Sequence, residues 1–79
     1  MLIFDGFESR LQADTFATTV AAEFGLAASV YDTQDQSDAV DIFPFTLNPP
    51  IVLVPRAAPK LEARVQVLVE RFGGSFAGT

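Results

Sequence analysis

Acidic side chains gathered in one stretch are the first residues of this sequence that could do chemistry. Aspartates recur at every third position from Asp32 to Asp41, and carboxylate oxygens are the ligands that calcium prefers. The calcium loop of an EF-hand, however, places its ligands at every second residue, with a glycine at the sixth position and a glutamate at the twelfth. This stretch has neither that spacing nor those two residues. We therefore expect a solvated acidic segment and no metal site.

The side chains that usually perform catalysis are scarce. The sequence has no histidine and no cysteine, which removes the usual base at neutral pH and the usual strong nucleophile. Asp5 and Glu8 form a carboxylate pair, but acids between a strand and a helix ordinarily serve the start of the helix. The glycines at positions 73, 74 and 78 follow a predicted helix, whereas a phosphate-binding loop precedes one. We expect a protein that is not an enzyme and that has no cofactor.

The segment 32–49 is expected to be a long connection that carries the partner-binding residues. Its first part is polar and its second part is apolar and rich in proline, whereas hairpin loops usually have about two to five residues. The apolar side chains either cover the domain's own core or form a stiff anchor for a partner pocket. The candidate binding residues are Asp35, Asp38, Asp41, Phe43, Phe45 and Leu47.

Two amphipathic helices are predicted on either side of this connection. Ser9 and Gln12 fit a capping box at the start of a helix over 9–24, and Pro59 suits the first turn of a helix over 59–72. A glycine directly after each helix supplies its end. The expected buried positions are Ala13, Phe16, Ala17, Val20, Ala21 and Phe24 in the first helix and Leu61, Val65, Leu68, Val69 and Phe72 in the second. The expected solvent-facing charges of the second helix are Glu62, Arg64, Glu70 and Arg71.

The chain divides into two similar halves, about 1–31 and 50–79. A shift of 48 residues aligns Phe4 with Val52 and the pair Phe24-Gly25 with Phe72-Gly73. Each half reads as strand, helix, strand, with strands predicted at 2–4, 26–31, 51–54 and 75–77. Two such units predict a single α+β domain over 1–79 with a ferredoxin-like βαββαβ sandwich. A four-stranded antiparallel sheet would carry both helices on one face, with the first and third strands inside.

A second apolar sheet face is expected from the two inner strands. Continuous apolar runs such as 51–54 point side chains to both faces, and two helices cover only one of them. A monomer seldom exposes an apolar patch of more than a few hundred Å². A second copy of the chain, a different protein or the segment 33–49 could cover the face, and we favour a homodimer.

Charge and hydropathy argue against nucleic acid and membrane partners. The net charge is −5, with −7 in residues 1–41 and +2 in residues 42–79, whereas phosphate-backbone binders need clustered cations. The opening Leu2-Ile3-Phe4-Asp5-Gly6-Phe7 loosely matches a strand motif of RNA-recognition domains, but the run 51–54 lacks the glycines, aromatics and basic flanks of the second motif. No apolar run reaches the roughly 18–20 residues of a membrane span, and the start lacks a signal peptide's cations. We expect a cytoplasmic protein.

The stretch 42–52, together with the Phe-Gly pairs that close both helices, resembles small uncharacterised proteins encoded by bacteriophages and prophages. The likeness covers most of the chain and carries no assigned activity. It implies a short protein that works by binding inside an infected bacterium, as an inhibitor, an accessory factor or a regulator.

Together these observations predict a non-enzymatic protein-protein interaction module that forms a homodimer and uses residues 33–49 for recognition. One alternative is an acidic inhibitor that mimics phosphate toward a host defence or nucleic-acid-binding protein. It would lose activity when Asp35, Asp38 and Asp41 are replaced by Asn, whereas apolar anchoring would depend on Phe43 and Phe45. A second alternative is a small-ligand sensor built on a dimer, which would show ligand-dependent melting.

Overall fold

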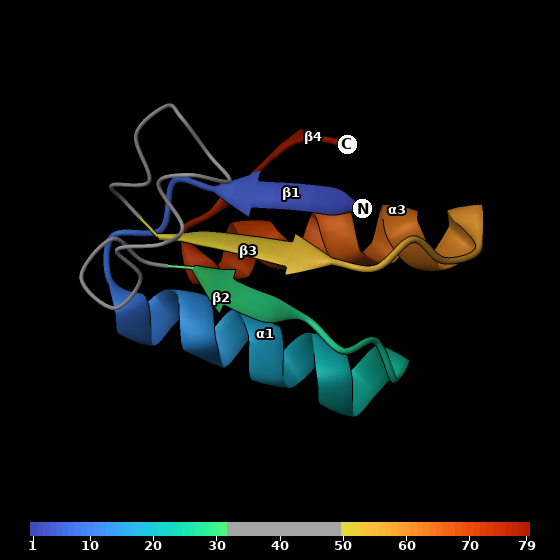
Figure 1. The fold of residues 1–79 in the computed structure, drawn as a ribbon, viewed down its shortest axis with the longest axis horizontal. Helices are drawn as coiled ribbons and strands as arrows, with labels where there is room; N and C mark the ends of the chain where they lie inside the picture. Colours follow the sequence, from blue (N-terminus) through green and yellow to red (C-terminus); the bar gives the residue numbers. More distant parts are fainter. Residues whose placement is uncertain (32–49) are drawn as a thin grey trace.

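The residues that the computed structural model describes, 1–31 and 50–79, alternate between strands and helices (Figure 1). The first part contains strand β1 (Leu2–Asp5), helix α1 (Arg10–Phe24) and strand β2 (Ser29–Tyr31). The second part contains β3 (Ile51–Val54), helix α3 (Pro59–Leu68), the 3₁₀ helix η1 (Val69–Phe72) and β4 (Ser75–Gly78). The predicted α+β class, with a four-stranded antiparallel sheet and two helices, is confirmed.

The sheet has the strand order β2-β3-β1-β4, and every neighbouring pair is antiparallel. The two strands with continuous apolar runs, β1 and β3, therefore occupy the inner positions (Figure 1). Strand β2 is shorter than predicted and begins at Ser29. The Ala28 amide donates to the Leu26 carbonyl at 2.9 Å, so this part of the chain makes a tight turn before the strand begins.

The internal repeat corresponds to equivalent positions in the structure. Phe4 and Val52, which the shift of 48 residues aligns, are partners in the register between β1 and β3. The helix of each half is followed by a glycine in the left-handed conformation, with φ of 68° at Gly25 and 77° at Gly73. The two halves thus pair with each other at the centre of the sheet, and in each half a left-handed glycine follows the helix.

Helix α1 starts and stops where the sequence predicts, but its capping differs in one bond. The Gln12 amide donates to Ser9 Oγ at 3.3 Å, as expected of the N-cap. Gln12 Oε1 accepts the amide of Glu8 at 2.9 Å, so the return bond goes to the residue before the N-cap instead of to Ser9 itself. The first bond satisfies an amide of the first helical turn that has no partner within the helix, and the second satisfies the amide of Glu8, which precedes the N-cap.

The second helix is α-helical only to Leu68 and tightens into η1 for its last turn. Such tightening is common at helix ends, because 3₁₀ bonds pair carbonyls that the α pattern leaves free. The amides of Gly73 and Gly74 donate to the carbonyls of Glu70 and Val69 at 3.3 and 3.2 Å. This turn brings the backbone of Gly74 against buried Phe7 and Val69.

One hydrophobic core joins both helices to alternate residues of β1 and β3. Phe16 lies at its centre, with its ring centroid 5.2 Å from that of Phe4 in an edge-to-face contact and 5.6 Å from that of Phe7. Ala21 was expected in the core but is exposed, because the buried stripe of α1 is narrow and ends at Val20. The buried members are Leu2, Phe4, Phe7, Ala13, Phe16, Ala17, Val20, Val52, Val54, Val65, Leu68 and Val69.

Candidate functional site

The six partner-binding candidates of the sequence all lie outside the described residues. Asp35, Asp38, Asp41, Phe43, Phe45 and Leu47 belong to the segment 32–49, so their role stays a prediction. The surfaces that can be assessed as binding sites are those of residues 1–31 and 50–79.

The residues that alternate with the core positions in the strands define what we call the second sheet face: Ile3, Tyr31, Ile51 and Leu53. Ile3 is the register partner of Leu53, and Tyr31 is the partner of Ile51, so the four side chains lie in two adjacent rows. Ile51 is buried and packs with Tyr31 and Leu53 in a cluster separate from the main core. This surface therefore carries three aliphatic side chains and one aromatic side chain across three strands.

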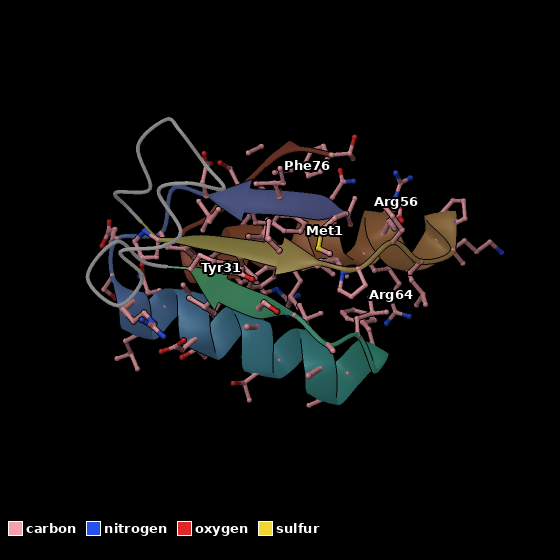
Figure 2. The ribbon with its side chains drawn as sticks, in the orientation of Figure 1. Met1, Tyr31, Arg56, Arg64 and Phe76 are labelled. Atoms are coloured by element: carbon pink, nitrogen blue, oxygen red, sulfur yellow. The ribbon has the colours of Figure 1, made fainter. Side chains whose placement is uncertain are left out.

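Polar groups border the second sheet face along its edges. Asp5, at the end of β1, accepts a hydrogen bond from Ser75 Oγ at 3.4 Å, and Ser29 is the register partner of Leu53 on β2. Met1, which is 55% exposed, extends the apolar surface at the start of β1. Figure 2 labels Met1, which precedes β1, and Tyr31 at the end of β2. An apolar centre with a polar border is the usual anatomy of a protein interface.

Glu62 is buried, contrary to the prediction that it faces solvent. Its carboxylate accepts the Ala57 amide at 2.7 Å and two bonds from the Arg56 guanidinium, at 2.9 and 3.4 Å. The N-cap of α3 is Ala58, which makes no side-chain capping bond, and Glu62 reaches back from the first turn of the helix to the amide of Ala57, the residue before the N-cap. The hydrogen bond from Arg56, and to a smaller extent that from the Ala57 amide, holds the pKa of Glu62 below its ordinary value.

This arrangement is structural and leaves Glu62 ionised at neutral pH. Both carboxylate oxygens already have donors, so the group is not prepared to take a proton from a substrate. The sequence signal for the arrangement was present: helix α3 begins with Pro59 after an alanine, and an arginine lies six residues before the glutamate.

A pocket of about 360 Å³ lies between the end of α1 and the outer side of α3 and η1. Phe24, Val67 and Leu68 provide its apolar surface, while Arg64 and Arg71 provide two cations. The remaining lining residues are Glu23 and Ala63. The Arg64 guanidinium carbon lies 5.2 Å from the centroid of the Phe24 ring, which is a cation–π distance. Arg64 and Arg71 were correctly predicted to be exposed, but nothing in the sequence indicated that Phe24 would join them in one pocket.

Metal-binding groups and membrane-spanning helices were also sought among the described residues. In the ranges 1–31 and 50–79, no group of three or more acidic side chains is placed so that it could hold a metal ion. Within those same ranges, no helix combines the length and the apolar character that a membrane crossing requires.

The surfaces that remain as candidates are thus the second sheet face and the pocket between α1 and α3. Comparisons with protein-family models, with curated proteins and with solved structures give no match to this chain.

Proposed function

We propose that this chain is a non-enzymatic protein-protein interaction module that acts as a homodimer in the cytoplasm. The observation that carries the proposal is the second sheet face, where Ile3, Tyr31, Ile51 and Leu53 form an uncharged surface on the inner strands and β2. Burial of such a surface against a partner is favourable at about 25 cal/mol per Å² of apolar area.

The proposed architecture is the ferredoxin-like sandwich, with both helices on the face opposite to the second sheet face. The strand order supports it, because each strand-helix-strand half leaves room between its two strands for a strand of the other half. The main core cluster supports it as well, because Phe16 and Val20 of α1 and Val65 and Leu68 of α3 share this cluster.

A second copy is the occupant that the charges favour. The chain has a net charge of −5, so two copies repel each other wherever acidic surfaces meet. The four residues of the second sheet face carry no charge, so a two-fold axis through this face brings apolar side chains together without opposing like charges. Two sheets then pack at about 10 Å, the ordinary spacing of stacked sheets.

The size of the face sets the strength of the dimer. Three strands about 4.8 Å apart, with about four residues rising about 3.4 Å each, give a flat face of about 200 Å². A standard interface buries about 800 Å² on each partner. The sheet face is thus the centre of the contact and not all of it, and the dimer should dissociate on dilution to about micromolar concentration.

The test is the solution mass by light scattering over a dilution series. We expect about 17 kDa, twice the chain mass of 8.5 kDa, at about millimolar concentration, falling toward 8.5 kDa on dilution. The double variant Ile3→Thr, Leu53→Thr keeps strand-forming residues and adds two hydroxyls, so it should remain at 8.5 kDa throughout.

A matched control distinguishes association through this face from nonspecific association through any exposed apolar residue. Leu11 on α1 is 74% exposed and lies on a helix instead of the sheet, so Leu11→Glu should leave the mass profile unchanged. Far-ultraviolet circular dichroism checks that each variant folds. A wild-type chain that stays at 8.5 kDa at about millimolar concentration, or an equal effect of Leu11→Glu, contradicts the proposal.

The setting we propose is that of the bacteriophage-encoded proteins that the stretch 42–52 resembles. A dimer would present two copies of the segment 32–49, and linked sites raise avidity without any new contact. The acidic and apolar candidates of that segment would then act on a second protein.

A further inference from the structure

We propose that the pocket between α1 and α3 is a binding site for a small amphipathic anion, a carboxylate or sulfonate attached to an aromatic or aliphatic body. The pocket is separate from the second sheet face, so the inference does not depend on the homodimer. Its volume of about 360 Å³ falls in the range of about 300–1,000 Å³ that is usual for small-molecule sites.

The apolar part of the pocket fits the body of such a ligand. Leu68 is buried at its base, Phe24 is half-buried at its side, and Val67 is 64% exposed at its opening. An aliphatic side chain with that exposure near the end of α3 loses contact with water when a ligand covers it, which favours binding. The lining thus offers both an aromatic ring, that of Phe24, and aliphatic side chains, those of Val67 and Leu68, for contact with the ligand.

The charges of the pocket favour an anion. Arg64 and Arg71 line it against a single carboxylate, that of Glu23. Among the described residues, Arg10 pairs with Asp14 at 3.3 Å and Arg56 pairs with Glu62 at 2.9 Å, and neither ion pair uses a pocket arginine. The pocket therefore concentrates positive charge on a chain whose net charge is −5.

Arg64 is already oriented for this role. Its guanidinium lies over the face of Phe24, with 5.2 Å between the guanidinium carbon and the ring centroid (Arg64 is labelled in Figure 2). A guanidinium has five N–H donors, and a contact with an aromatic ring supplies them with no acceptor oxygen, so they can still donate to an oxyanion. Because the ring restricts the side chain beforehand, less conformational entropy is lost when the anion binds.

Arg71 lies at the other end of the pocket. It is seven residues after Arg64, which places it two turns further along the same side of the helix, about 10–12 Å away. The apolar lining lies between these two cations. An anion held at Arg64 therefore directs its apolar body over Val67 and Leu68 toward Arg71, whose charge adds a weaker, longer-range attraction.

The test compares 2-naphthoate with its neutral analogue 2-naphthamide in nuclear magnetic resonance titrations of the full chain. We expect naphthoate to shift the amide signals of residues 23–24 and 63–71 and to bind at least about ten-fold more tightly than naphthamide. Arg64→Gln should weaken naphthoate about ten-fold, and Arg64→Lys should restore only part of the loss, because an ammonium cannot stack and donate as a guanidinium does.

Lys60→Gln is the matched control. Lys60 lies one turn before Arg64 on α3 and outside the pocket, so the substitution removes the same charge without touching the lining. Its effect on the dissociation constant should stay within about two-fold. Melting curves show whether each variant is folded, so a loss of binding in a folded Arg64→Gln chain reports on the pocket.

Five outcomes overturn the proposal. Naphthoate and naphthamide could bind equally well, Arg64→Gln could leave the affinity unchanged, or Lys60→Gln could weaken binding as much as Arg64→Gln does. Shifts confined to the second sheet face, or no shifts at about 5 mM naphthoate, also contradict it.

Discussion

Gly74→Ala is the substitution whose effect follows most directly from the packing. A Cβ atom at this position would lie 2.6 and 2.7 Å from Cε1 and Cζ of Phe7 and 2.9 Å from Cγ2 of Val69. Real Cβ atoms essentially never approach other atoms this closely. Phe7 and Val69 are 1% and 0% exposed, so neither side chain has an open space into which it could move.

Two opposing effects set the magnitude. Adding a methyl group to a packed core costs about 1–3 kcal/mol, and three contacts below 3.0 Å with two buried side chains favour the upper part of that range. Replacing glycine by alanine also restricts the unfolded chain, which stabilises by about 0.4–1 kcal/mol. The net loss in the free energy of unfolding is about 2 kcal/mol. At about 4–8 °C per kcal/mol for a domain of this size, the melting temperature should fall by about 8–16 °C.

The assay is thermal and urea denaturation followed by circular dichroism. Gly25→Ala is the control, because nothing lies within 4 Å of its Cβ position and its φ of +68° adds only backbone strain, about 1–2 kcal/mol. In a Phe7→Leu background, which removes the ring atoms that clash, Gly74→Ala should cost at least about 1 kcal/mol less. Equal stability of Gly74→Ala and wild type, or an unchanged cost in the Phe7→Leu background, would refute the reasoning.

Three further substitutions test the helix ends and the core. Ser9→Ala removes the N-cap of α1 and should lower the free energy of unfolding by about 1 kcal/mol in urea titrations, with no comparable loss for Ser9→Asn, which also caps. Glu62→Gln should destabilise at pH 7, where the lowered pKa keeps the carboxylate ionised, and the difference in melting temperature from wild type should shrink as the pH falls below about 4.3. A difference that is constant from pH 7 to pH 2 would contradict the role of that charge. Phe16→Ala removes the ring that contacts Phe4, Phe7 and Phe72 and should cost about 3–5 kcal/mol, whereas Leu11→Ala on the exposed side of the same helix should change stability by about 0.5 kcal/mol or less.

The elements could be predicted from the sequence because their signals are local. Ser9 and Gly25 mark the two ends of α1, and each does so through a hydrogen bond to a residue three or four positions away. The run 51–54 forms a strand, as its aliphatic side chains suggest. The inner positions of β1 and β3 also follow from local composition, because only inner strands are apolar on both faces.

Features that depend on distant contacts could not be predicted in this way. Phe7 is fully buried although it lies in no helix or strand, because the turn at Gly73 and Gly74 provides part of its surroundings. The pocket is equally non-local, since it needs Phe24 from α1 and Arg64 from α3 at one place. Glu62 was predicted to face solvent because helical periodicity carries no information about its hydrogen bond to the Ala57 amide, which precedes the helix.

The position of β1 has a consequence for how the domain folds. Strand β1 has its two neighbours in β3 and β4, and the bond from Ser75 to Asp5 joins residues 70 positions apart. Closing such long loops costs chain entropy before any contact compensates for it, so folding is slower than for helical bundles of the same size. Leu2 and Phe4 consequently have no complete core to enter until β3 and β4 have paired with β1. We therefore expect this domain to fold as one unit, with the apolar side chains of β1 exposed until both neighbouring strands have joined it.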